Sequence, residues 1–557
     1  MTVTTPPESS AGKRAPRAAL GAYATRAAFW NTVLLPAKLG SHLLAQLVLA
    51  NALPKAEFGV YVLALSVGVT SGSLVDLGTE RSVVKFLPEV AGRQGRKGVR
   101  SLLTWVFGFK MAVLLPVILL ATALHGSFFR FLDGRVPQGK PESASVAQIV
   151  RQEHWTIFAA VVSLVLVGAF YDVAMQSLVA TFRNKSWNVI TILVTLADPI
   201  TVAALVLSGG NIATVLVGRV FVALLAMVLA GIFAVVAVRQ STESEREFVE
   251  EAERDRPLPI RRFARYSSLQ YALQVTSFFT SYAFAALILR NAEDIAGYRV
   301  AAGSVREILS ALTTPIIGIQ VPIFTRIFTS RDDGQLGQAY GIVTRFLVVI
   351  LLPGAIGMAL LVPNIFRILY PQYVSYSGVC IALVLLLFAE SCLSTGTTVL
   401  LTFERYRPVI AARTIALLAL PVMFFTARAY GAMGAALTSG GFALLAALVG
   451  TVASNALLPI RYPLDFVRRV AIAVICMAAV VGGLAFSIGR VPDDIGSKLH
   501  RLLWLAVTAG IAALGGVIYI AVFRRMGGIE DSDIERLKTL RLPMRGAIVR
   551  LLSGRRA

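Results

Sequence analysis

Charged residues, cysteine and histidine are scarce in this 557-residue chain. Only 15% of its residues are Asp, Glu, Lys or Arg, and it has 3 cysteines and 4 histidines. Cys380, Cys392 and Cys476 all fall within or beside apolar stretches, which argues against a disulfide framework. The histidines are scattered and show no HExxH or Cys/His spacing. We therefore expect no metal site and no cofactor, apart from a proton or sodium ion that couples to activity.

Motifs for nucleotide binding and covalent catalysis are also missing. Gly134 to Lys140 matches the glycine–lysine skeleton of a phosphate loop, but Pro141 replaces the Ser or Thr that would hold magnesium. No strand is predicted before this segment, and no nucleophile elbow occurs in the chain. The sequence therefore does not indicate an enzyme or a directly ATP-driven protein.

Long apolar stretches are what the chain has in abundance. Apolar residues make up 56% of the sequence, and the mean hydropathy is +0.72. A bilayer core roughly 30 Å thick needs about 20 helical residues to cross it, and about 14 stretches reach that length. The predicted spans are 28–51, 58–79, 102–124, 154–178, 188–207, 212–238, 267–289, 297–323, 341–363, 377–402, 409–427, 434–457, 468–488 and 501–523. The sequence predicts an all-α polytopic membrane protein.

The net charge of +22 is explained by its distribution. With the N-terminus in the cytoplasm, the inside loops and tails carry roughly three times as many Lys and Arg residues as the outside loops, which is the bias that orients membrane helices. We therefore expect a multi-pass protein of the cell membrane (plasma or inner membrane), with both termini cytoplasmic. We do not expect a nucleic-acid partner.

Composition divides the chain into six parts. A Pro- and Ser-rich basic tail is predicted to be disordered rather than a cleaved signal peptide, and a basic C-terminal tail with interleaved apolar residues suits an amphipathic helix on anionic lipid. The predicted parts are tail 1–25, first lobe 26–238, cytoplasmic linker 239–265, second lobe 266–458, additional helices 459–523 and tail 524–557.

Short repeats relate the two lobes. Asn51-Ala52 followed by Gly59-Val60-Tyr61 recurs as Asn291-Ala292 followed by Gly297-Tyr298. Parallel repeats of this kind imply two bundles related by an axis along the membrane normal, with a site between them. We therefore predict two pseudo-symmetric six-helix lobes around a central cavity, plus two C-terminal helices. Chance similarity between apolar helices is the alternative.

The first span of each lobe carries one polar stripe at helical spacing. The stripes comprise Asn31, Lys38, His42 and Gln46 in the first lobe, and Ser267, Gln270, Gln274, Ser277 and Ser281 in the second. Hydrogen bonding between helices would explain the Ser and Gln residues. It explains Lys38 poorly, because a mid-membrane lysine costs about 3 kcal/mol. A central cavity accounts for both stripes, and pairing of Lys38 with a buried acid such as Asp172 or Glu390 is the alternative.

Several segments in order resemble polysaccharide-type flippases of the MOP superfamily. They are Phe58-Gly59-Val60-Tyr61, Leu74 to Gly78, Arg81 to Pro88, Leu369 to Tyr373 and Tyr430 to Ala436. The resemblance covers roughly residues 28–520. It implies two lobes around a V-shaped cavity and transfer of undecaprenyl-diphosphate-linked sugars from the cytoplasmic to the outer leaflet. It also implies that the last two spans form a groove for the lipid tail.

Charged residues inside the spans are the candidate site residues. Arg299 and Arg306 join Lys38 and His42 as candidate phosphate ligands, since guanidinium and ammonium groups suit phosphate. An ion pair with Glu307 or another intramembrane acid is the alternative for Arg306. Lys110 and Arg219 are expected to snorkel or to pair structurally. Candidate ion-coupling acids are Asp76, Asp172, Asp198, Glu307 and Glu390, each of which could equally be a counter-ion.

Three functions compete at this point. The preferred one is a flippase for a polyprenyl-diphosphate-linked oligosaccharide, working among membrane lipids and in contact with a polysaccharide polymerase or a glycosyltransferase complex. The second is a multidrug or cation antiporter of the same superfamily, whose cavity should be acidic and aromatic. The third is a membrane polysaccharide polymerase or ligase, which would need a larger outside loop than 125–153.

Overall fold

The computed structural model describes residues 30, 33–136, 141–181, 183–246, 260–330, 333–403, 405–487, 491–492 and 498–528. These residues are nearly all helical and contain no strand, as the sequence predicts. Asn31, the N-terminal tail, residues 247–259 of the predicted linker and residues 529–557 of the C-terminal tail lie outside them.

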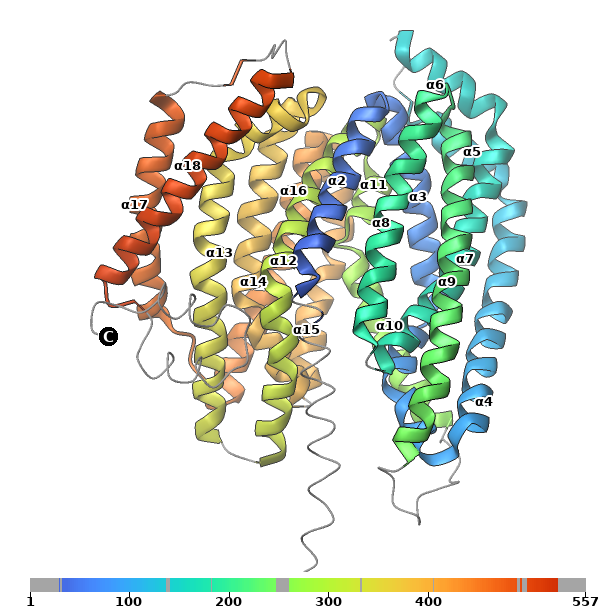
Figure 1. The fold of residues 1–557 in the computed structure, drawn as a ribbon, viewed down its shortest axis with the longest axis horizontal. Coiled ribbons are helices and arrows are strands. Elements are labelled where there is room, and N and C mark those ends of the chain that lie inside the picture. The colour runs from blue at the N-terminus through green and yellow to red at the C-terminus, as the bar shows by residue number, and fades with distance from the viewer. Residues whose placement is uncertain are drawn as a thin grey trace, which may run out of the picture.

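The first bundle lies on the right of Figure 1. Its long helices pack mainly on one another, with α7 against α4 and α9, and α8 against α2 and α9. Two short helices, α5 and α6, cover one end. The bounds are α2 Leu35–Ala52, α3 Lys55–Asp76, α4 Thr79–Ala123, α5 His125–Asp133, α6 Pro141–Gln152, α7 His154–Ala180, α8 Asn184–Leu207 and α9 Ile212–Arg246.

The second bundle occupies the centre of Figure 1 and is built around α14. Helices α12, α13 and α16 all pack on α14, and α10 packs on α15. The bounds are α10 Ile260–Phe278, α11 Tyr282–Ile288, α12 Ala292–Ser330, α13 Asp333–Leu369, η2 Pro371–Tyr376, α14 Ser377–Thr402, α15 Tyr406–Leu417 and α16 Ala419–Leu457.

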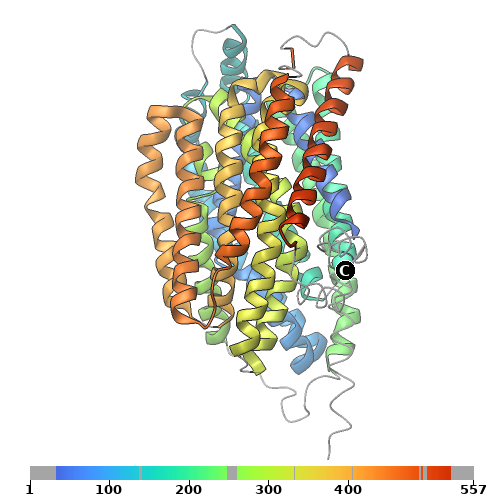
Figure 2. The ribbon, with the colours of Figure 1, turned by 90° about the vertical axis from the view of Figure 1, so that its left-hand side faces the viewer.

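The last two helices, α17 (Leu464–Ser487) and α18 (Lys498–Arg525), stand outside both bundles. They pack on each other and on α13, at the left edge of Figure 1 and toward the viewer in Figure 2. Their buried faces carry Val470, Met477 and Val481 from α17, and Phe523 from α18. The predicted arrangement of two bundles plus two C-terminal helices is therefore observed.

Ten helices within the described ranges are long and apolar enough to cross a membrane, or eleven if the bent pair α10–α11 counts as one span. One of the ten runs from Tyr406 to Leu457, but its backbone turns at Gly431, where φ is +55°. Helix α2 lies outside the set because Lys38, His42 and Gln46 lower its mean hydropathy. Each of the 14 predicted spans overlaps a helix, and the protein is a multi-pass membrane protein.

Three predicted spans differ in detail from the helices. The 267–289 span is not one rod, because the backbone breaks around Thr280 and bends by 52°, and the Ser281 hydroxyl caps α11 by accepting from the Phe284 N–H at 3.2 Å. The 102–124 span is only the second part of α4, which begins at Thr79 and kinks at Gly95. The 409–427 span contains a one-residue interruption at Leu418, between α15 and α16.

The two bundles touch closely at the end that carries α5 and α6. A Cβ at Gly59 of α3 would lie 1.9 Å from the carbonyl oxygen of Ala292, so only glycine permits this approach. The Asn51 amide donates to the Leu369 carbonyl at 3.0 Å. Arg135, which follows α5, donates to the carbonyls of Leu287, Ile288 and Leu289 at the end of α11. The interior is thereby closed at this end.

A second set of contacts bridges the bundles at the opposite end. The hydroxyls of Ser82 on α4 and Ser267 on α10 lie 2.6 Å apart, and both side chains are buried. A Cβ at Gly78 would lie 2.2 Å from the Ser267 carbonyl oxygen. Phe86 packs against Phe263 and Tyr266 nearby. The two bundles are therefore in contact at both ends.

Candidate functional site

A cavity of about 450 Å³ lies between the two bundles. Helices α2, α3, α7, α8 and α9 supply one wall, and α11 and α12 supply the other. Its charged lining residues are His42, Asp198, Arg219, Arg299 and Glu307. Since these residues come from positions up to 265 apart in the chain, the cavity exists only when the two bundles are brought together.

Arg219 and Asp198 form an ion pair on the first-bundle side of the cavity. The guanidinium lies 3.2 Å from the Asp198 carboxylate, and it also donates to the Tyr61 hydroxyl. Pro199 follows Asp198 within α8 and cannot donate a backbone hydrogen bond. One Asp198 oxygen, Oδ1, is buried and accepts no hydrogen bond from the residues the structure describes. Arg219 is thus neutralised structurally, as the sequence predicts.

His42 and Lys38 of α2 face Glu307 of α12. The His42 Nδ1 lies 3.6 Å from the Glu307 carboxylate. Lys38, one turn earlier, interacts electrostatically with the same carboxylate, and its ammonium lies 4.5 Å from the centre of the Trp187 ring. The acid beside Lys38 is therefore Glu307, and not Asp172 or Glu390, the two acids named as examples of a buried partner. Two basic side chains share one carboxylate here.

Arg299 of α12 contributes a cation without an ion pair. Its guanidinium carbon lies 4.4 Å from the centre of the Tyr282 ring on α11. Among the described residues no carboxylate oxygen lies within 4.0 Å of it. A cation–π contact uses the flat face of the guanidinium, and anions are bound along its N–H edges. Arg299 is therefore the cavity cation best placed to take a phosphate oxygen.

Gln46 lines the cavity, Arg306 is not among its lining residues, and both side chains make contacts that hold helices together. The Gln46 amide donates to the Val300 carbonyl at 2.6 Å and to the Ser304 hydroxyl at 2.9 Å, which ties α2 to α12. Arg306 donates to the carbonyl of Thr280 at 3.0 Å, at the break between α10 and α11. No Arg306–Glu307 ion pair within 4.0 Å occurs among the described residues, and the intramembrane acid on which Arg306 acts electrostatically is Glu390.

The polar side chains predicted to form one stripe along the 267–289 span do not line the central cavity together. Ser267 bonds to Ser82, and Ser277 accepts from Arg413 at 2.9 Å. Gln270 is hydrogen-bonded to Tyr266 on the same helix, and Gln274 lines a different cavity. The 52° bend separates Ser281 from the rest. The residues up to Ser277 do lie on one helix, α10, but they contact different parts of the protein.

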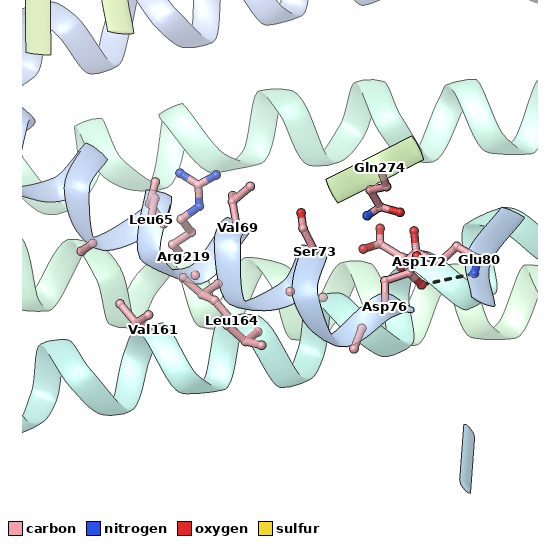
Figure 3. Close-up of a pocket in the computed structure, with 16 residues that line it drawn as sticks. Leu65, Val69, Ser73, Asp76, Glu80, Val161, Leu164, Asp172, Arg219 and Gln274 are labelled. Atoms are coloured by element: carbon pink, nitrogen blue, oxygen red, sulfur yellow. Dashed lines mark hydrogen bonds between the residues drawn. The ribbon is translucent and has the colours of Figure 1, made fainter. Parts of the chain in front are cut away.

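That different cavity, of about 300 Å³, lies among α3, α4 and α7 of the first bundle. Figure 3 shows the carboxylates of Asp76, Glu80 and Asp172 gathered at one end of it, with Gln274 of α10 pointing toward them. Lys110 of α4, whose side chain is 1% exposed, lies 3.2 Å from Asp76 and 2.9 Å from Glu80. Asp172 acts on the same ammonium electrostatically. Three acids thus surround one lysine.

Asp76 also shapes the backbone at this point. It is the last residue of α3, and its Oδ1 accepts from the Thr79 hydroxyl at 2.9 Å and from the Glu80 N–H at 3.2 Å, at the start of α4. Its Oδ2 is buried and accepts no hydrogen bond from any residue described. The sequence did not single out Glu80, because Glu80 lies in the polar segment before the 102–124 span.

Glu390 lies apart from both cavities, within the second bundle. It accepts from the Ser391 hydroxyl at 3.2 Å and interacts electrostatically with Arg413 and Arg306. Of the five predicted acids, Asp198 and Glu307 therefore line the central cavity, and Asp76 and Asp172 line the first-bundle cavity. No group of three or more metal-binding side chains suited to a metal ion occurs within the described part of the chain.

Solved structures with the same fold are transporters. One is described as "Lipid II flippase MurJ, inward closed conformation"; it is 13% identical, the match covers 90% of this chain and 98% of that one, and the TM-score is 0.63. Another is an inward-facing multidrug resistance MATE family transporter of the MOP superfamily, 13% identical, covering 75% and 94%, with a TM-score of 0.51. No family model matches the sequence, and no curated protein does. The chain is thus a polytopic membrane protein with the fold of MOP-superfamily transporters.

Proposed function

We propose that this protein is a flippase that moves a polyprenyl-diphosphate-linked oligosaccharide from the inner to the outer leaflet by alternating access. The single observation that carries the proposal is that basic groups outnumber acidic ones at the central cavity, where three basic and two acidic side chains form part of the lining and Lys38 lies one turn beyond His42. Asp198 forms an ion pair with Arg219. The Glu307 carboxylate interacts with both Lys38 and His42. Arg299 has no carboxylate oxygen within 4.0 Å among the described residues, and its guanidinium lies on the Tyr282 ring. A diphosphate would supply the missing negative charge.

The physical task fits this arrangement. A polyprenyl tail can remain in lipid during transfer, whereas a diphosphate and a glycan need a polar route. The cavity between the two bundles supplies polar and charged side chains along such a route. The fold shared with a lipid II flippase supports the same proposal.

We further propose that a proton or sodium ion drives the cycle through the first-bundle carboxylates. Asp76, Glu80 and Asp172 meet around Lys110 in a cavity separate from the central one. Three acids beside one ammonium leave the group able to take up another positive charge. Asp198, Glu307 and Glu390 are weaker candidates, since each is a single acid beside at least one arginine, lysine or histidine, whereas the first-bundle acids outnumber their one cation.

A cation antiporter is the second candidate function. The similarity of this fold to that of the MATE family transporter supports this second function. The cavity charge opposes it, because a cationic substrate would meet His42 and Arg299 in the lining, with Lys38 one turn beyond His42.

A transport assay in proteoliposomes separates the two. We expect transfer of a fluorescent undecaprenyl-diphosphate-linked saccharide and no uptake of a cationic dye. Arg299→Ala should lower transfer about tenfold or more, the loss of a charge-assisted contact, and Arg299→Lys should retain part of it. Arg405→Ala, an exposed arginine between α14 and α15, is the matched control. Uptake of the dye without transfer of the lipid would refute the flippase.

A further inference from the structure

We propose that a pocket between α13, α17 and the α16–α17 connection binds the phosphate headgroup of an anionic phospholipid. This pocket, of about 1130 Å³, is separate from both cavities described above. Arg345 of α13, Arg461 of the connection and Arg469 of α17 line it. Asp465 is the one carboxylate among its described lining residues, so the lining carries an excess of positive charge.

A buried phenylalanine positions two of these arginines. Phe466 is 2% exposed, and the guanidinium carbons of Arg345 and Arg469 lie 5.8 Å and 5.5 Å from the centre of its ring. Stacking on an aromatic ring fixes the plane of a guanidinium, and a phosphate then binds along its N–H edge. The two guanidiniums come from different helices, α13 and α17, and lie near the same ring, so one phosphate could contact both.

The pocket also lies at the start of a helix. α17 begins at Leu464, which lines the pocket, so the positive end of the helix dipole lies there. Anions are stabilised at helix N-termini by the unsatisfied backbone N–H groups. This contribution adds to the three arginines and is opposed by Asp465 alone.

Exposed apolar residues beside the pocket favour a lipid over a free phosphate. Leu457, at the end of α16, is 51% exposed, and Leu464 is 71% exposed. Further along α17, Ile472 and Ile475 are 42% and 67% exposed, and Ile472 lies three residues after Arg469 on the same helical face. Arginines with adjoining apolar side chains match a phosphate joined to acyl chains.

The position in the membrane agrees with this ligand. The pocket is lined by the first part of α13, whose last residue, Leu369, meets Asn51 at the α5–α6 end. It therefore lies at the opposite end, which is the predicted cytoplasmic side. The cytoplasmic leaflet carries anionic headgroups, and basic pockets between helices at that surface bind them.

Native mass spectrometry with added phosphatidylglycerol or phosphatidylcholine tests the proposal. We expect the full chain to retain phosphatidylglycerol in preference to phosphatidylcholine. Arg345→Gln/Arg461→Gln/Arg469→Gln should raise the apparent Kd for phosphatidylglycerol at least roughly tenfold, the equivalent of one charge-assisted hydrogen bond. The control Arg100→Gln/Arg405→Gln/Arg407→Gln removes the same charge from exposed positions elsewhere and should leave the Kd unchanged.

A charge-conserving variant, Arg345→Lys/Arg461→Lys/Arg469→Lys, distinguishes loss of the binding site from misfolding. It should keep most of the phosphatidylglycerol preference if the pocket recognises phosphate, and the Tm of each variant in lipid-free detergent reports folding.

Equal loss in the triple glutamine and control variants would overturn the proposal in favour of general surface charge. So would full competition by millimolar inorganic phosphate, which would identify a soluble anion as the ligand. Stronger lipid binding after neutralising Glu530, Asp531, Asp533 and Glu535 would identify the acidic part of the C-terminal tail as the occupant instead.

Discussion

The Nδ1 atom of His42 lies 3.6 Å from the carboxylate of Glu307, and this contact joins α2 to α12 across the boundary between the bundles. Lys38 acts on the same carboxylate from one turn away. One acid therefore balances an ammonium and, whenever His42 is protonated, an imidazolium as well. An anionic substrate entering the cavity would complete the charge balance, and its departure would restore the shared arrangement.

Lys38 is the sharpest test of that balance. If Lys38 contacts the substrate diphosphate, Lys38→Ala should lower flipping about tenfold or more, the loss of a charge-assisted contact, while leaving Tm nearly unchanged. Lys38→Arg should retain part of the activity, because the charge persists while its geometry changes. The measurement is transfer of the labelled lipid-linked saccharide in proteoliposomes beside thermal unfolding in detergent.

The competing explanation for Lys38 gives a different result. If Lys38 only neutralises Glu307, the alanine variant leaves that carboxylate with one basic neighbour fewer and should be poorly folded. The double variant Lys38→Ala/Glu307→Gln should then recover both folding and flipping. That recovery would rule out a substrate contact by Lys38.

Gly59 controls how closely the bundles meet at the α5–α6 end. Gly59→Ala places a methyl group against the Ala292 carbonyl and should destabilise the closed state by about 1–3 kcal/mol, the usual cost of overpacking. We expect a lower Tm and greater thiol labelling of a cysteine introduced nearby at Gln372. Gly72→Ala on the same helix is the control, since no atom lies within 4 Å of that Cβ. Equal effects of the two substitutions would show that the close approach is not limiting.

Asp172 should report on ion coupling. Asp172→Asn leaves the contacts of Lys110 with Asp76 and Glu80 in place, so the fold should survive. We expect flipping to lose its stimulation by a proton or sodium gradient, whereas equilibration without a gradient persists. Asp133→Asn, at the surface pair with Arg151, is the control. Uphill transport driven by ATP alone would contradict gradient coupling altogether.

The predicted orientation can be checked by labelling with a membrane-impermeant thiol reagent in sealed cells. Cysteines at Gly134 and Gln372, which are exposed near the α5–α6 end, should react from outside. A cysteine at Arg405, exposed at the other end, should not. The background chain should carry Cys476→Ser, because Cys476 is partly exposed whereas Cys380 and Cys392 are buried. The opposite pattern would invert the topology.

The spans were predictable because hydrophobic length is a local property. Each long apolar stretch corresponds to a helix, since the chain between two polar loops must satisfy its backbone hydrogen bonds internally. The bend after Phe278 and the turn at Gly431 were not predictable in the same way. They depend on Ser281 capping α11 and on the positive φ of one glycine, and neither changes the hydropathy of the stretch.

The site residues were predictable as types but not as partners. Lys38 and His42 stand out in an apolar helix, and their spacing places them on one face. Their acidic neighbour Glu307 is more than 260 residues away, and four other intramembrane acids were equally good candidates in the sequence. Gln46 shows the same difficulty, because its partners Val300 and Ser304 could be known only once α2 and α12 were placed side by side.

Arg219 lines both the central cavity and the first-bundle cavity, together with Leu65, Val69, Leu164 and Gly168. A single guanidinium thus stands in the common wall of the proposed saccharide and ion sites. Under the proposed function, any free energy by which the diphosphate changes the affinity for the ion must equal the free energy by which the ion changes the affinity for the diphosphate. Titrating either ligand at fixed concentrations of the other would therefore give one coupling constant, and substitution of Arg219 would diminish it from both directions at once.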